Sequence, residues 1–206
     1  MMTKIAAVLF AVLLAFALLL SVLYVELSLP GLMEKRFEMF AQAPGDYARL
    51  ARDITGYLNG KDIALDYFQA HEQAHMKDVQ ALVGLLKQVL IALWASILLL
   101  AFFLRRRPIR KAAAITLLVA LLLVLFAAIY AVVDFDGLFV LFHKIAFTND
   151  LWLLNPYTDY LIQLMPIGFF MAYALSVGLI WGLLMVLCIF LQRRNHGLLF
   201  RFKKAN

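Results

Sequence analysis

The segment IAAVLFAVLLAFALLLSVLYV, residues 5–25, decides the fold class of this chain. Its 21 residues include no charged side chain. An α-helix needs roughly 20 such residues to cross the hydrocarbon core of a bilayer. The segment is longer than the apolar region of a cleavable signal peptide, and no small-residue cleavage site precedes Glu26. We therefore expect residues 5–25 to form a membrane span that is retained in the protein.

Three further apolar segments of similar length predict spans at 84–104, 112–133 and 167–191. Of the 206 residues, 65% are hydrophobic, which is typical of an integral membrane protein and not of a soluble domain. The single cysteine excludes an internal disulfide framework. The predicted fold class is an all-α membrane protein with four transmembrane helices and a small extracytoplasmic cap.

The cap is expected to comprise residues 26–83 and 134–166, which lie between the spans and are more polar. Short strands around residues 63–68 are an alternative to helix in this region. Its expected elements are amphipathic helices at 32–43 and 46–58, a helix at 71–87 that extends the second span, and an interfacial or re-entrant segment at 138–147 that is too short to span.

The distribution of charge predicts the topology. Residues 1–4, 105–111 and 192–206 hold 11 of the 19 Lys and Arg residues and none of the 13 acids. Since basic loops stay on the cytoplasmic side, both termini are expected in the cytoplasm and the cap on the outer side of the plasma membrane. This arrangement accounts for the net charge of +6, so no nucleic-acid partner is expected.

Two polar clusters lie on the predicted outer side, HEQAHMKD at 71–78 and FHKIAFTNDLWLLNP at 142–156. His143 stands in an apolar segment at a membrane surface, where a titratable group is a candidate for function. His75 and Asp78 are three residues apart, so they can share a helix face. The alternatives are an interfacial histidine bonded to headgroups or a carbonyl, and a solvated helix face.

Other polar residues of these clusters have structural alternatives of their own. Trp152 and Tyr157 suit an interfacial aromatic belt. Asn149, Asp150 and Asp159 can cap helix ends.

A covalent serine or cysteine mechanism is disfavoured by the sequence. Cys188 lies near the cytoplasmic end of the last predicted span, and no nucleophile-elbow pattern surrounds Ser21 or Ser28, the two serines near the outer side. Histidine and carboxylate are present on that side, and these are groups of general acid–base catalysis.

Two other functions remain open from the residues alone. His71, Glu72 and His75 match the zincin pattern H-E-x-x-H, in which two histidines bind zinc and the glutamate is the base. A third ligand would be required, and His143 could supply it, as in a zinc-dependent membrane protease. A non-enzymatic membrane subunit or sensor is the second alternative, with the histidines as interface residues.

The segments HMKDV (75–79), FHKIAFTNDLWLLNPYTDYLI (142–162) and PIGFF (166–170) resemble the family of the bacterial lipoprotein intramolecular transacylase Lit. The four-span layout and the long first outer loop also resemble this family. Two features depart from its pattern. His71 is not part of it, and Ile167 and Gly168 stand where an acidic residue is expected.

The resemblance implies an acyltransferase that acts on a diacylglyceryl lipoprotein. The sn-2 acyl chain would move to the α-amino group of the same N-terminal cysteine, giving a lyso-form lipoprotein. His143 and His75 would be the catalytic pair, with Asp78, Asn149, Asp150 and Trp152 as supporting residues. We expect no metal or cofactor, membrane lipids as neighbours, a monomer, and an active site at the outer leaflet.

Overall fold

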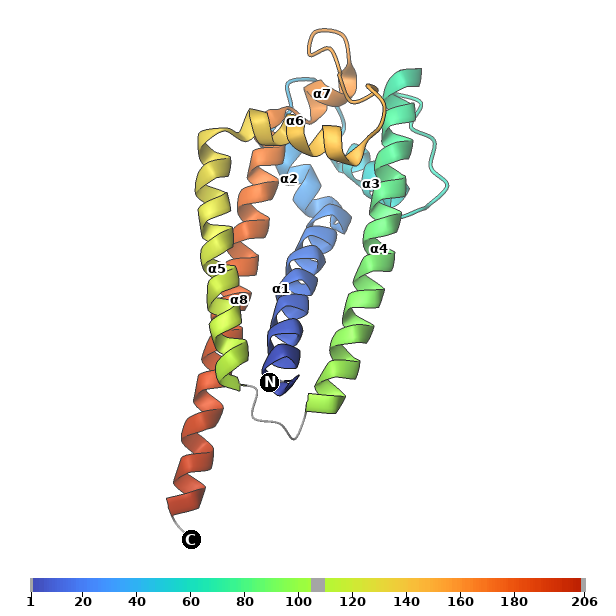
Figure 1. The fold of residues 1–206 in the computed structure, drawn as a ribbon. Coiled ribbons are helices and arrows are strands. Elements are labelled where there is room, and N and C mark those ends of the chain that lie inside the picture. Colours follow the sequence, from blue (N-terminus) through green and yellow to red (C-terminus); the bar gives the residue numbers. More distant parts are fainter. Residues whose placement is uncertain (1, 105–109, 205–206) are drawn as a thin grey trace. The chain divides into compact units, whose positions relative to one another are not determined.

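The computed structural model describes residues 2–104 and 110–204, and its regular elements there are all α-helices (Figure 1). Residues 63–68, for which strands were an alternative, form turns and irregular structure. Residues 105–109 of the basic loop and the side chains of the basic tail at 192–206 lie outside the described residues. The helices are α1 (Met2–Ser28), α2 (Pro30–Phe40), α3 (Tyr47–Leu58), α4 (Ala70–Leu104), α5 (Arg110–Val133), α6 (Phe135–Ala146), α7 (Tyr160–Leu164) and α8 (Ile167–Lys204).

The prediction of an all-α membrane protein is confirmed. Among the described residues, three helical segments are long and apolar enough to cross a bilayer: Lys4–Ser28, Ala70–Leu104 and Ile167–Leu191. On α4, large apolar side chains such as Ile91 and Leu98 are 72% and 68% exposed, as expected of a surface that faces lipid. In α5 the described apolar part is the shorter segment Ile115–Phe126, so the fourth span stays a prediction.

The chain divides into two compact units. The first comprises Met1–Val22, Leu90–Ala128 and Gly178–Asn206. Its core joins α1, α5 and α8 and consists of Ala11, Ala15, Leu117, Trp181 and Met185. The alanines of α1 allow close approach of the Trp181 ring, whose Nε1 donates a hydrogen bond to the Ala15 carbonyl at 2.8 Å.

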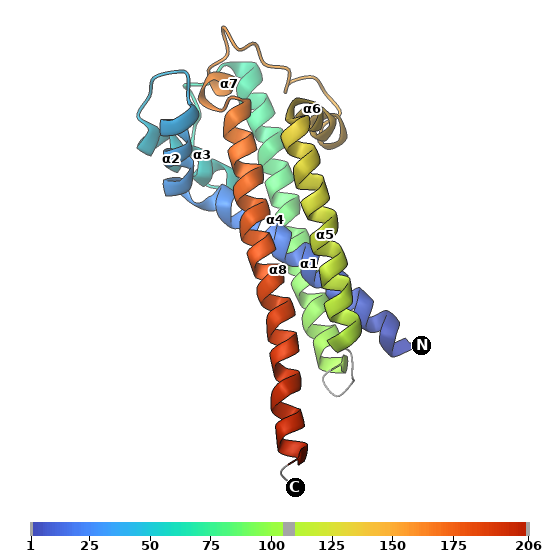
Figure 2. The same cartoon turned by 90° about the vertical axis from the view of Figure 1, so that its left-hand side faces the viewer.

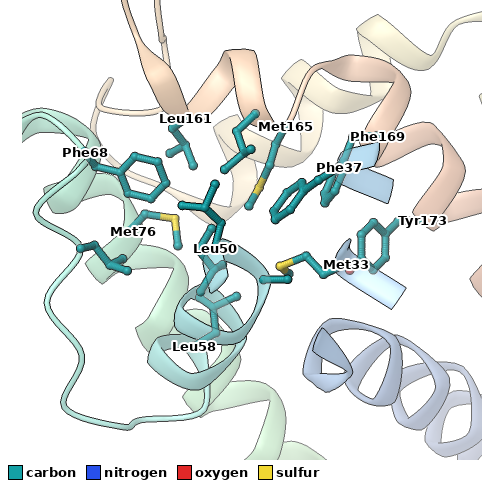
Figure 3. Packing of buried hydrophobic residues seen from close by; sticks show 14 of the residues in the cluster. Met33, Phe37, Leu50, Leu58, Phe68, Met76, Leu161, Met165, Phe169 and Tyr173 are labelled. Atoms are coloured by element: carbon teal, nitrogen blue, oxygen red, sulfur yellow. The ribbon is translucent and has the colours of Figure 1, made fainter. Parts of the chain in front are cut away.

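The second unit comprises Leu23–Val89 and Ile129–Val177 and contains both polar clusters. Its apolar core is built by α2, α3, the first turns of α4, α7 and the first turns of α8 (Figure 3). Phe37 and Phe169 stack there with ring centroids 5.4 Å apart. Other core residues are Met33, Leu50, Leu58, Phe68, Met76, Leu161, Met165 and Tyr173. Since α7 packs into this core through Leu161, its position is fixed relative to α4.

Local signals set several helix ends in the second unit. Pro30 is the first residue of α2, where its missing N–H costs nothing. The Asp134 side chain caps α6 by accepting from the Gly137 amide at 3.0 Å. A Cβ at Gly137 would clash with the same carboxylate, so a larger residue there would displace this cap. With 12 residues, α6 is about 18 Å long, too short to span.

A buried ion pair lies beside the apolar core of the second unit. Arg36 on α2 bonds to Glu26 near the end of α1, and the two residues are 6% and 3% exposed. Ser176 on α8 donates to the Glu26 carboxylate at 2.8 Å and accepts from Arg36 at 2.6 Å. The Arg36 guanidinium lies 3.6 Å from the centre of the Tyr173 ring. These contacts join α1, α2 and α8.

Replacing Arg36 by Met should lower the free energy of unfolding by about 3–5 kcal/mol, because Glu26 is then left buried without its cation. The double variant Glu26→Gln/Arg36→Met should recover part of this loss. Unfolding in detergent, followed by circular dichroism, measures both. Lys35→Met, at an exposed position of the same helix, is the control. Wild-type stability in the Arg36→Met protein would contradict this account of the pair.

Candidate functional site

The first turns of α4 present one polar face to the segment 143–161. His71, Glu72, His75 and Asp78 recur at spacings of three and four and so lie along that face. His71 Nε2 lies 3.0 Å from an Asp159 carboxylate oxygen. Asp78 accepts from the Asn149 side-chain amide at 2.8 Å. Between these two contacts, the rings of His75 and His143 lie 6.1 Å apart, centroid to centroid. The structure thus brings the two sequence clusters together.

His143 is held in one tautomer by its own helix. Its Nδ1 lies 2.7 Å from the Phe139 carbonyl oxygen, one turn earlier in α6. A carbonyl can only accept, so Nδ1 carries the proton and the neutral ring has its lone pair on Nε2. The sequence interpretation missed Phe139, although its spacing of four from His143 on a predicted helical segment was the available signal.

Aromatic rings surround His143 and lower its affinity for a proton. Trp152, Phe139 and Phe147 have their ring centroids 5.0, 4.1 and 5.6 Å from that of His143, which is 7% exposed. Burial lowers the pKa of His143 from its ordinary value of 6.5, and the hydrogen bond to the Phe139 carbonyl opposes part of this effect. The imidazole is therefore neutral at pH 7 and its Nε2 can accept a proton.

His75 is also buried, with 7% of its surface exposed. Its Nδ1 has no hydrogen-bond partner among the described residues. The expected contact with Asp78 is not formed, because the Asp78 carboxylate bonds to Asn149. Phe147 packs edge-on against the His75 ring, with the two ring centroids 5.1 Å apart. The same phenylalanine also contacts the ring of His143. His75 Nδ1 is thus a buried polar atom without a partner in the described part of the chain.

The remaining candidate residues lie around a surface pocket beside His143. The pocket has a volume of about 660 Å³, and Trp152 both lines it and contacts the His143 ring. Asn149 is fixed at its rim, since its side-chain oxygen also accepts from the Leu151 amide at 3.1 Å. Asp150 lines the same pocket, together with Val140, Lys144 and Leu153.

The residues of the zincin pattern make contacts within the protein that differ from those of a zinc site. His71 is engaged by Asp159, and both oxygens of the Glu72 carboxylate accept backbone N–H groups. Among the side chains that the structure describes, no group of three or more His, Cys, Asp or Glu has the geometry of a metal site. The donor arrangement therefore does not fit the proposed zinc ligands His71, His75 and His143.

A family model described as "Lipoprotein intramolecular transacylase Lit" matches residues 1–170. The chain belongs to the lipoprotein intramolecular transacylase family. It is thus an acyltransferase and a membrane-integral protein, as the resemblance in the sequence implied. The family name implies a lipoprotein substrate.

Solved structures share the fold of this transacylase-family chain. The membrane-integral Lit of Bacillus cereus, determined in meso, is 20% identical with a TM-score of 0.78, covering 100% of this chain and 99% of the other. A variant of it with one histidine replaced by alanine gives a TM-score of 0.76 at 20% identity, covering 100% of this chain and 96% of the other. A search of curated proteins finds no match.

The His143 environment can be tested by NMR titration in detergent. Its imidazole should titrate below pH 6.5, because burial disfavours the cation. In Trp152→Ala the ring becomes more exposed and its midpoint should move up toward 6.5. The spectrum of His143→Gln assigns the signal among the four histidines. A wild-type midpoint at or above 6.5 would show that the ring is not buried as described.

Proposed function

We propose that this protein moves the sn-2 acyl chain of a diacylglyceryl lipoprotein to the α-amino group of the lipoprotein's own N-terminal cysteine. The proposal rests on one observation above all. Two buried imidazoles lie 6.1 Å apart, and the contact between His143 Nδ1 and the Phe139 carbonyl leaves Nε2 as a free base. In this reaction the nucleophile belongs to the substrate, so the protein has to supply proton transfer and orientation.

His143 is the proposed base. An α-amino group titrates at about 8, so at neutral pH most of the substrate is ammonium and cannot attack. His143 Nε2 accepts one proton and passes it to solvent. The free amine then attacks the ester carbonyl carbon, forming the new C–N bond.

His75 is the proposed electrophilic partner. The tetrahedral intermediate carries an oxyanion and a protonated nitrogen, and a donor N–H from His75 can stabilise the oxyanion. The second side-chain N–H of Asn149 is a further candidate donor. His143 removes the second proton from the nitrogen and delivers it to the glyceryl oxygen as the C–O bond breaks. The products are an amide and an alcohol, and one proton has gone to solvent.

The serines and the cysteine of the chain support a mechanism without an acyl-enzyme. Each serine has another structural contact: Ser21 accepts from Trp94, Ser28 contacts Asn59, Ser96 bonds within α4, and Ser176 joins the Glu26–Arg36 pair. Cys188 lies on α8 in the first unit, whereas both histidines are in the second. Orientation of the substrate's own amine against its ester is then a large part of the rate enhancement.

The location of the reaction follows from the charge distribution. With the basic segments in the cytoplasm, both histidines are at the outer leaflet of the plasma membrane, where lipoproteins are anchored. The acyl chains remain in the bilayer while the cysteine amine reaches His143. We propose that the protein acts there as a monomer.

Replacing either histidine should abolish the modification, because general acid–base catalysis contributes about 10²- to 10⁴-fold. The chain is expressed in a bacterium that makes diacyl lipoproteins and lacks this activity, and mass spectrometry is run on the N-terminal lipopeptide of one lipoprotein. Wild type should give an N-acyl, mono-O-acyl cysteine. His143→Ala and His75→Ala should leave the diacyl form with a free amine.

His196→Ala is the matched control, since His196 belongs to the basic segment 192–206 on the predicted cytoplasmic side, and it should retain the product. A diacyl lipopeptide from wild type would contradict the proposed function. A diacyl lipopeptide from wild type together with zinc in the purified protein would favour the protease alternative. Unchanged product in His143→Ala would contradict the assignment of His143 as the base.

A further inference from the structure

We propose that Glu72 is a positioning residue for the acyl transfer, holding the segment 143–161 against α4 so that His143 faces His75. The role in catalysis rests on the proposed function above. The role in positioning rests on the contacts alone.

Glu72 joins the beginnings of two helices through one buried carboxylate. The residue is 0% exposed. One oxygen accepts from the Leu161 amide in the first turn of α7 at 2.6 Å, and the other accepts from the Gln69 amide just before α4 at 2.7 Å. Amides at helix starts have no partner within the helix, so both donors depend on this carboxylate. Figure 2 shows α7 beside the beginning of α4.

The contact between His71, the residue before Glu72, and Asp159 reinforces the contacts of Glu72. Asp159 is 5% exposed and accepts from the Asn155 amide at 2.8 Å as well as contacting His71. The hydrogen bond with His71 is the main reason that the pKa of Asp159 lies below its usual value. Glu72 and Asp159 together hold the C-terminal part of the segment 143–161, which follows Trp152, in place against α4.

Nearer the start of the segment, the hydrogen bond between Asn149 and Asp78 holds it to α4. His75 lies between Glu72 and Asp78, three residues from each, and Trp152 lies between Asn149 and Asp159 in the sequence. Trp152 in turn contacts the ring of His143 at 5.0 Å. If the Glu72 contact is lost, the Asp159–His71 contact alone holds this part of the segment, and the Trp152–His143 contact is fixed less firmly.

A direct catalytic role for Glu72 is disfavoured by its surroundings. Both carboxylate oxygens are occupied by backbone N–H groups, and no part of the residue reaches the surface. A substrate therefore has no surface through which to reach Glu72, and protonation would weaken its two charge-assisted hydrogen bonds. These surroundings favour a positioning role for Glu72 over the role of general base that the zincin pattern suggests.

The test compares Glu72→Gln with wild type on a purified diacylglyceryl lipopeptide. Glutamine keeps the shape but turns an NH₂ group toward one of the two amide donors. The turnover number should fall about 10- to 100-fold, because a displacement near 1 Å in a catalytic group has this effect, while the Michaelis constant changes little. Glu38→Gln, the same substitution at an exposed site on α2, should have wild-type kinetics.

A spectroscopic readout reports the position of Trp152 without requiring activity. A protonated imidazole in contact with an indole quenches its fluorescence, so acidification should quench Trp152 in wild type. Subtracting the titration of Trp152→Phe isolates this signal from Trp94 and Trp181. Glu72→Gln should lose most of the quenching amplitude, whereas Glu38→Gln should keep it. Asp159→Asn should behave as Glu72→Gln does and replaces it if that variant does not fold.

Three results would overturn the proposal. Wild-type turnover in Glu72→Gln would show that the contact is dispensable. Reduced turnover with the full quenching amplitude would show that Glu72 acts in the chemistry and not through position. Full amplitude in both variants would show that the segment is held without this contact. An inactive wild type would instead count against the proposed function, and the fluorescence comparison would still decide the positioning role.

Discussion

The contacts between one face of α4 and the segment 143–161 determine the geometry of the candidate site. Glu72 bonds to the Leu161 amide, His71 to Asp159, and Asp78 to Asn149, so the segment is tied to α4 on both sides of His75. Two of these ties use buried carboxylates, Glu72 and Asp159, which would be costly to bury without a partner, whereas the Asp78–Asn149 contact is exposed. The two histidines come from segments far apart in the sequence, and their ring separation of 6.1 Å depends on these ties and on the packing of α7 into the core of the second unit.

Burial gives the two imidazoles their chemical character. Aromatic neighbours disfavour the imidazolium form of His143, and the Phe139 carbonyl selects the tautomer with a free Nε2. A neutral base of this kind suits a reaction in which a substrate ammonium has to lose its protons. Because the amine and the ester belong to one substrate molecule, the protein gains most by holding them in a reactive orientation. Membership of the lipoprotein intramolecular transacylase family agrees with a mechanism in which the substrate supplies the nucleophile and the protein supplies proton transfer and orientation.

Sequence alone predicted the features that depend on local pattern. Apolar length gave the helical membrane fold, and the isolation of His143 in an apolar segment singled it out. The roles of Glu72 and Arg36 were missed, because their partners are contacts of the folded chain. Leu161 is 89 residues from Glu72 and Ser176 is 140 from Arg36, and no spacing rule reaches so far.

The central claim is that the histidine pair directs the substrate's own amine to its own ester, with no acyl group on the protein. A crossover experiment tests this most directly. Purified protein is mixed with two diacylglyceryl lipopeptides, one with a deuterated sn-2 chain and the other with an isotopically heavy peptide, and product and protein masses are measured during turnover. The account predicts N-acylated products in which each label stays on its own molecule, and an unchanged protein mass. Products that carry both labels, or a protein heavier by one acyl chain, would contradict it.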